Sequence, residues 1–236
     1  MGVGPLVKLP VPVALRDPMR WPAAAGALLQ PLRASRPGML RARGQSRAAV
    51  QPCDNCTDAP DGWEYVFSYG SNSTAQLAQR LGRNGAFEFH PAMLPDHCRI
   101  FAGHSQRWGG AVASVHPCPG QQVHGLLVLM TAAEMGVLDT YEGSYTRMVK
   151  VFHYHDQAGQ AKEAKGWVYV KDDTTWRGPP SQSYLLAIHK MLSEGGHSCH
   201  VDICQVARDD SVVRSGHWTL DKGLVVSEPE PAGTAV

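Results

Sequence analysis

The chain has 236 residues, of which 43% are hydrophobic and 18% charged, so it can bury one sizeable core and one domain is expected. It contains no run of about 18 apolar residues, so we expect no membrane-spanning helix. Residues 1–50 hold eight of the 22 Lys and Arg residues but only one of the 21 Asp and Glu residues. Residues 51–236 therefore carry a mildly acidic net charge, and we expect no nucleic-acid partner.

The N-terminal residues differ in composition from the rest of the chain. Residues 1–50 are rich in Arg, Ala, Pro and Leu, as organelle transit peptides are. Two interpretations stay open: a transit peptide to a mitochondrial or plastid matrix, or an extension without a fold in a cytoplasmic protein. In both cases we assign residues 1–60 to an N-terminal extension, 61–196 to one globular domain, and 197–236 to a loose C-terminal tail.

The six cysteines follow no regular pattern. Cys53 and Cys56 form half of a zinc-ribbon spacing, and Cys199, His200 and Cys204 lie close together, but neither group is complete. We therefore expect no metal. The irregular spacing also argues against a secreted disulfide framework and favours a reducing compartment.

Several segments rich in β-branched and aromatic residues, separated by turn signals, are predicted to form strands. These segments are 64–69, 98–104, 109–116, 123–130, 147–155 and 166–171.

Three helical patterns lie between these segments or after them. Residues 73–82 end at a glycine, residues 131–143 open with a Thr-x-x-Glu capping box, and residues 181–196 follow two prolines and end in two glycines. Strands outnumber helices and their order is mixed. This predicts an α+β fold around one sheet or small barrel.

The segment YVFSYGSN (65–72) leads an alternating apolar strand into a turn, and a helix starts directly after it. Successive backbone N–H groups in such a turn can point into one concavity, and the helix N-terminus adds unpaired donors. Gly70, Ser71 and Asn72 are therefore candidates for holding a carboxylate or another anion. The alternative is an ordinary turn in which Asn72 or Ser73 caps the helix.

The second helical pattern places a carboxylate at the end of its apolar face. Met135, Leu138 and Glu142 follow an i, i+3, i+7 spacing and share that face. A carboxylate in such a position must find a donor or carry a raised pKa, and a pKa near the operating pH suits a general acid or base. The alternatives are that Glu142 extends into solvent or pairs with Arg147.

Taken together, these segments resemble the γ-glutamylcyclotransferase family. The resemblance runs in order from about Tyr65 to Gly196, and YGSN and the D-x-x-E-G element are its most specific motifs. The quoted matches are YVFSYGSN, WGGAVASV (108–115), VHGLLVLM with LDTYEG (138–143), and PPSQSYLLAI (179–188). Asn72 resembles the branch that acts on γ-glutamyl amino acids, because the glutathione-specific branch usually has an apolar residue there and the γ-glutamylamine branch has Tyr-Gly-Thr.

The resemblance implies a small mixed sheet forming a barrel with flanking helices. It also implies a lyase that cyclises L-γ-glutamyl-L-amino acids to 5-oxoproline and releases the free amino acid. Glu142 would be the catalytic acid/base, and the substrate would be bound by Tyr69, Gly70, Ser71, Asn72 and Tyr145. The match at Tyr145 departs from the family, whose members often have a longer glycine-containing loop between the Glu and a following Tyr.

This reaction consumes no metal or nucleotide, so no cofactor is expected, and the expected partner is a small γ-glutamyl molecule. The alternatives are a glutathione-specific or γ-glutamylamine cyclotransferase of the same fold, or a binding module without catalysis. The sequence leaves open whether the protein forms a homodimer.

Overall fold

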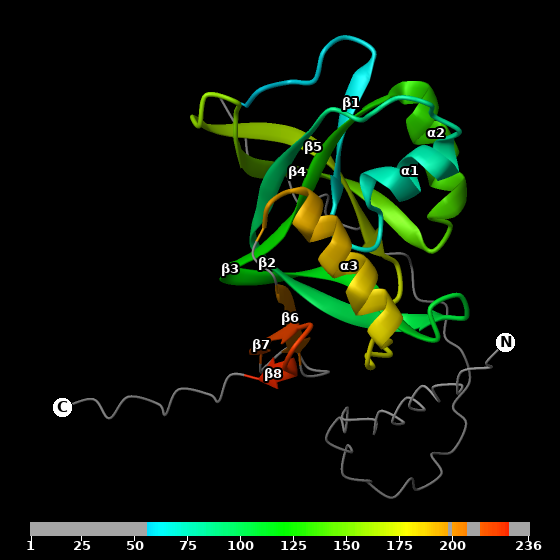
Figure 1. The fold of residues 1–236 in the computed structure, drawn as a ribbon, viewed down its shortest axis with the longest axis vertical. Helices are drawn as coiled ribbons and strands as arrows, with labels where there is room; N and C mark the ends of the chain where they lie inside the picture. The colour runs from blue at the N-terminus through cyan, green and yellow to red at the C-terminus, as the bar shows by residue number, and fades with distance from the viewer. Residues whose placement is uncertain (1–55, 198–199, 207–212, 227–236) are drawn as a thin grey trace, which may run out of the picture. The chain divides into compact units, whose positions relative to one another are not determined.

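The computed structural model describes residues 56–197, 200–206 and 213–226. Most of the predicted N-terminal extension, and with it the possible transit peptide, lies outside these residues. Five of the strands form a closed barrel in the order β1-β3-β2-β4-β5 (Figure 1). This arrangement confirms the predicted α+β class with a small barrel. The barrel strands are β1 (Trp63–Ser68), β2 (Phe89–Ser105), β3 (Gly110–Thr131), β4 (Tyr145–His155) and β5 (Ala161–Lys171).

The barrel closes through its one parallel pair. Strand β1 pairs with β5 in parallel at Val66↔Trp167 and Phe67↔Val168, whereas the other barrel pairs are antiparallel. The interior is apolar, and the rings of Phe67 and Phe152 stack there with centroids 4.7 Å apart. Because β1 and β5 run parallel to each other, their C-terminal ends lie at the same end of the barrel.

Strands β2 and β3 are longer than the sequence predicts. Strand β3 joins the two predicted segments 109–116 and 123–130, and β2 already begins at Phe89. Proline has no N–H to donate to a ladder and so argues against a strand. Here Pro91 and Pro95 lie within β2, and a register shift follows Pro95, next to Asp96 with its positive φ of 54°.

The three predicted helices are present, with the expected caps. Helix α1 (Thr74–Leu81) is capped by the Ser73 side chain and ends at Gly82 in the left-handed conformation. Helix α2 (Ala132–Tyr141) opens with the predicted capping box, in which Thr131 and Glu134 bond reciprocally. Helix α3 (Gln182–Glu194) has a serine N-cap.

Ionic contacts tie the helices together beside the barrel. Arg83 at the end of α1 pairs with Glu134 of α2 at 3.2 Å. The backbone N–H of Thr74 donates to Glu194 Oε2 of α3 at 2.9 Å. The start of α1, directly after the YGSN turn, is therefore fixed by α3, and its end is fixed by α2.

The C-terminal segment is not a loose tail throughout, and that expectation is wrong for residues 200–206 and 213–226. These residues form a three-stranded sheet of β6 (His200–Val206), β7 (Val213–Thr219) and β8 (Gly223–Val226). Val201, Ile203 and Trp218 are buried, which shows that this sheet has an apolar face of its own.

The cysteines in the described part of the chain do not assemble into a metal site. Cys204 is buried in one cluster with Cys98 and Cys118, all three as free thiols, whereas Cys56 is disulfide-bonded. Cys53 and Cys199 lie outside the described residues. Within residues 56–197, 200–206 and 213–226 no group of three or more potential ligand side chains could hold a metal ion. None of the helices described is long and apolar enough to cross a membrane.

Candidate active site

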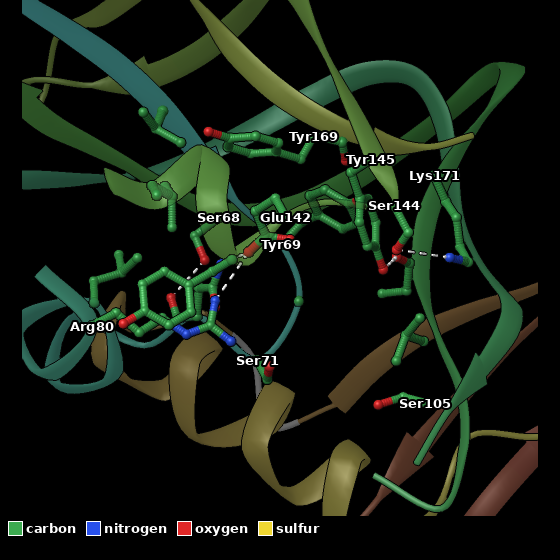
Figure 2. A pocket seen from close by; sticks show the side chains of 18 of the residues that line it. Ser68, Tyr69, Ser71, Arg80, Ser105, Glu142, Ser144, Tyr145, Tyr169 and Lys171 are labelled. Atoms are coloured by element: carbon green, nitrogen blue, oxygen red, sulfur yellow. Dashed lines mark hydrogen bonds and ion pairs between the residues drawn. The ribbon is translucent and has the colours of Figure 1, made fainter. Parts of the chain in front are cut away.

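A cavity of about 350 Å³ opens where β1 ends and α1 and α2 approach the barrel, a volume within the range of small-molecule sites. All the residues that the sequence singled out as catalytic or substrate-binding line this cavity, although they come from separate segments (Figure 2). They are Tyr69, Gly70, Ser71, Asn72, Glu142 and Tyr145.

The YGSN turn presents unused backbone donors to the cavity. Ser68 Oγ donates to the carbonyl of Asn72 at 2.6 Å and so closes the turn, and Ser73 caps the helix that follows. Among the described residues none accepts a hydrogen bond from the backbone N–H of Gly70, Ser71 or Asn72. Adjacent unpaired amides at a helix start form a suitable site for an anion. The helix cap and the anion site therefore coexist, because the cap is Ser73.

Gly70 is required by the packing behind the turn. A Cβ at this position would lie 3.2 Å from the hydroxyl oxygen of Tyr184, closer than ordinary packing allows. That oxygen accepts a hydrogen bond from the backbone N–H of Ala113 at 3.1 Å and cannot easily move away. Glycine thus lets the turn lie against the α3 tyrosine that forms the cavity floor.

The carboxylate of Glu142 lies at the C-terminus of α2 and contacts the turn directly. Glu142 Oε1 accepts from Asn72 Nδ2 at 3.2 Å and from Arg80 Nη1 at 3.0 Å. The side chains of Glu142 and Arg80 are only 13% and 14% exposed. A carboxylate on the apolar face was expected either to find hydrogen-bond donors or to carry a raised pKa. In the structure it has two donors. Within the described chain Oε2 has no hydrogen-bond partner, so this oxygen is available to a ligand.

The alternative partner, Arg147, is engaged elsewhere. Arg147 Nε pairs with Asp139 Oδ1 at 3.3 Å, and the same carboxylate oxygen accepts from the Tyr169 hydroxyl at 2.7 Å. The Asp of the D-x-x-E-G element therefore ties α2 to β4 and β5. This leaves the Glu three residues later to face the cavity.

Arg80 is a site residue that the sequence did not reveal. It comes from α1, pairs with Glu142, and lies 5.2 Å from the centre of the Tyr141 ring. Arg83, three residues later and just beyond the end of α1, looks equivalent in sequence but pairs with Glu134 instead. Only the packing of α1 on α2 distinguishes the two arginines.

The tyrosine hydroxyls of the cavity form hydrogen bonds with the backbone and are not bases. Burial raises the pKa of Tyr69 well above its usual value, and burial also raises the pKa of Tyr184 to about 12, so both stay protonated at neutral pH. The Tyr69 hydroxyl donates to the carbonyl of Tyr169 at 2.6 Å, behind the turn as expected.

Tyr145 is positioned beside Glu142 through its backbone. Its N–H donates to the carbonyl of Glu142 at 2.8 Å, which makes the short EGSY segment a tight turn. Its hydroxyl donates to the carbonyl of Ala113 at 3.1 Å, not to the Glu142 carboxylate. The Tyr145 side chain therefore does not orient that carboxylate through a hydrogen bond, but it lines the cavity in which the substrate was expected to bind.

Comparison with known proteins places these features in a family. The model of the gamma-glutamyl cyclotransferase, AIG2-like family matches residues 66–186, a segment that contains the turn, the carboxylate and the third helix's first half. The chain belongs to this family. Membership indicates an enzyme of the cyclotransferase type and agrees with the resemblance seen in the sequence.

The chain is also similar to individual proteins and solved structures. A human gamma-glutamylcyclotransferase is 27% identical over 148 residues, which cover 61% of this chain and 78% of that protein. The crystal structure of an uncharacterized human protein is 28% identical with a TM-score of 0.51, over 58% of this chain and 82% of that one. A solved gamma-glutamyl cyclotransferase is 26% identical with a TM-score of 0.49, over 57% and 80%.

Proposed function

We propose that this protein is a γ-glutamylcyclotransferase that converts L-γ-glutamyl-L-amino acids to 5-oxoproline and the free amino acid. One observation carries the proposal: the Glu142 carboxylate contacts Asn72 of the turn whose free amides line the same cavity. A proton acceptor and a candidate anion site thus line one cavity, as a bound glutamyl group requires.

The turn would hold the α-carboxylate of the substrate. The N–H groups of Gly70, Ser71 and Asn72 supply donors for this anion, and the start of α1 adds the positive end of its dipole. With the carboxylate fixed there, the adjacent α-amine comes close to Glu142. The γ-carbonyl can then fold back toward the amine inside the cavity.

Glu142 would move the proton that blocks the reaction. The substrate amine is an ammonium ion at neutral pH and cannot attack until it loses a proton. Glu142 Oε2 accepts this proton, and the amine nitrogen attacks the γ-carbonyl carbon. The amide C–N bond then breaks as the departing nitrogen receives this proton and a second proton released by the attacking nitrogen, which leaves a neutral lactam and a free ammonium group. Arg80 and Asn72 hold the other oxygen and thereby fix the direction of the carboxylate.

The ring closure is intramolecular, so binding in a curled shape supplies much of the acceleration. Well-oriented intramolecular reactions reach effective molarities of roughly 10⁵ M or more. The atoms balance without water, metal or nucleotide. One carboxylate and one anion site are therefore sufficient for this chemistry.

Glu142→Gln tests the proposal. Glutamine is isosteric and can still contact Asn72, but it cannot accept the ammonium proton, so kcat/KM for γ-glutamyl-L-alanine should fall by roughly 10²-fold or more. The measurement is chromatographic detection of 5-oxoproline. Circular dichroism and thermal unfolding of the variant check that it folds.

Glu134→Gln is the matched control, because Glu134 is on the same helix and also pairs with an arginine but does not line the cavity. It should keep the parent rate. A Glu142→Gln protein that releases 5-oxoproline at the parent rate would refute the role of Glu142. Parent protein that forms no 5-oxoproline from γ-glutamyl-L-alanine, glutathione or γ-glutamylethylamine would refute the proposed function altogether.

A further inference from the structure

The cavity has a second wall that the cyclisation chemistry does not use. Beyond Glu142 and Tyr145 it is lined by the ends of β2 and β5 and by the loop after α2. In Figure 2, Arg80 and Glu142 occupy one side of the view, and Lys171 with Ser144 occupies the other. The lining residues of this wall are His104, Ser105, Arg107, Trp108, Ser144 and Lys171.

Lys171, at the C-terminal end of β5, is held in place on this wall. Its Nζ donates to Ser144 Oγ at 3.2 Å and lies 5.0 Å from the centre of the Tyr145 ring. Its aliphatic stem passes over Gly103, which has a φ of 60°, and a Cβ on Gly103 would collide with Lys171 Cε. The stem is therefore positioned by packing, and the ammonium is held by a solvent-exposed hydrogen bond.

The charge of Lys171 is not neutralised by a neighbouring carboxylate. Among the described residues none forms an ion pair with its Nζ, although the pKa of Asp173 in the next loop is lowered by hydrogen bonds from Thr175 and also by the Lys171 charge. The nearby Asp172 accepts from Thr146 at 2.6 Å, and Asp173 is bound to its own loop through Thr175. An ammonium has three N–H donors, and Ser144 takes one. Two donors remain for a ligand.

We propose that Lys171 binds the α-carboxylate of the leaving amino acid and so selects γ-glutamyl amino acids over γ-glutamylamines. This inference rests on the proposed function. When the glutamyl carboxylate lies on the amides of residues 70–72 and its amine lies at Glu142, the leaving group extends toward the unused wall. An amino acid places a second carboxylate there, whereas an amine places none.

Lys171 is favoured over the other cation of this wall. Arg107 is exposed at the mouth of the cavity, with its guanidinium 5.4 Å from the centre of the Trp108 ring. A flexible exposed arginine is screened by solvent, whereas a lysine fixed between Gly103 and Tyr145 keeps its position when the ligand arrives. The proposal therefore assigns the selectivity to Lys171.

The test compares two substrates that differ only in the carboxylate. γ-Glutamyl-L-alanine and γ-glutamylethylamine have the same scissile amide, and the second lacks only the carboxylate of the leaving group. The measured quantity is the ratio of their kcat/KM values for 5-oxoproline release. We expect the parent protein to favour the alanine compound by roughly 10-fold to 100-fold, as one charge-assisted hydrogen bond allows.

Lys171→Met keeps the stem and removes the charge, and it should lower this ratio by about tenfold or more. Lys171→Arg should restore most of the ratio. Lys165→Met is the matched control, since Lys165 lies on the same strand but does not line the cavity, and it should leave the ratio unchanged.

The outcomes separate this inference from the proposed function. If Lys171→Met lowers both kcat/KM values alike, Lys171 only supports Tyr145 or binds the glutamyl end, and the inference is wrong. The inference is also wrong if the parent protein shows no preference for γ-glutamyl-L-alanine over γ-glutamylethylamine. It is equally wrong if Arg107→Met, rather than Lys171→Met, removes this preference. If the parent forms 5-oxoproline from neither substrate nor from glutathione, the proposed function itself fails.

Discussion

Ser68 is the residue that holds the ends of the anion-binding turn together. It is the last residue of β1, is buried, and donates to the carbonyl of Asn72 four residues later at 2.6 Å. The bond fixes the carbonyl of Asn72, and residues 70–72, whose backbone N–H groups have no acceptor among the described residues, line the cavity. A single hydroxyl thus holds the turn to which we assign substrate binding.

Ser68→Ala should therefore weaken binding more than it slows chemistry. The lost hydrogen bond is worth about 1 kcal/mol, which corresponds to a rise of several-fold in KM for γ-glutamyl-L-alanine with a smaller change in kcat. Steady-state kinetics measure both constants. Ser193→Ala is the control, because its hydroxyl also donates to a backbone carbonyl four residues away but on the exposed side of α3. An unchanged KM in Ser68→Ala would show that the turn keeps its shape without this bond.

Arg99 connects elements that are distant in the chain. It is fully buried in β2, and its guanidinium donates to three backbone carbonyls. The acceptors are Tyr69, the first residue of the YGSN turn, at 3.2 Å, His124 of β3 at 2.6 Å, and Asp202 of β6 at 3.1 Å. The C-terminal sheet and the turn are therefore both anchored to one side chain.

Arg99→Met should destabilise the fold strongly. Methionine fills similar space but leaves these carbonyls without a donor, at about 1–3 kcal/mol for each that water cannot reach, so we expect a loss of about 3 kcal/mol or more. Urea unfolding at pH 7 measures this free energy. Arg147→Met, which breaks a half-exposed ion pair with Asp139, should cost about 1 kcal/mol or less. Similar losses in the two variants would refute an anchoring role for Arg99.

The sequence predicted the elements whose local pattern matches their environment. Helix α2 was predictable because its capping box and its Met135–Leu138 stripe both agree with the structure. The start of β2 at Phe89 was not, because this strand depends on long-range pairing with β3 along its length rather than on local propensity, and its prolines argue against a strand. The C-terminal strands lie in a segment whose overall composition is polar, and Val201, Ile203 and Trp218 are buried in the sheet.

In the candidate site, too, local sequence patterns predict some residues, and only tertiary packing determines the others. The turn and Glu142 were predictable because each combines an unusual residue with a specific local position. Arg80 and Lys171 were not, because each is one of several similar cations in its segment. Only the packing of α1 on α2, and of β5 beside Gly103, places these two charges at the cavity.

On the scale of the whole molecule, the cavity depends on tyrosines that remain neutral. Tyr69 follows β1 and Tyr184 lies in α3, more than a hundred residues later in the chain, yet both are buried at the same cavity. Burial raises the pKa of both phenols, that of Tyr184 to about 12. In the unfolded chain the same groups ionise near pH 10.

The fold should therefore lose stability in alkali. Below about pH 10 both states keep the phenolic protons and the free energy of unfolding is unaffected by them. Above it the unfolded chain releases protons that the folded chain retains, so stability falls as pH rises, by about 2 kcal/mol between pH 10 and pH 11 for the two tyrosines. Urea midpoints at pH 8, 9, 10 and 11 measure the loss. Tyr184→Phe should reduce the slope, since phenylalanine does not titrate, and Tyr141→Phe at an exposed site should not. A midpoint that stays constant to pH 11 would mean that these phenols ionise in the folded protein as readily as in the unfolded chain, and the buried, neutral tyrosines described for this cavity would be wrong.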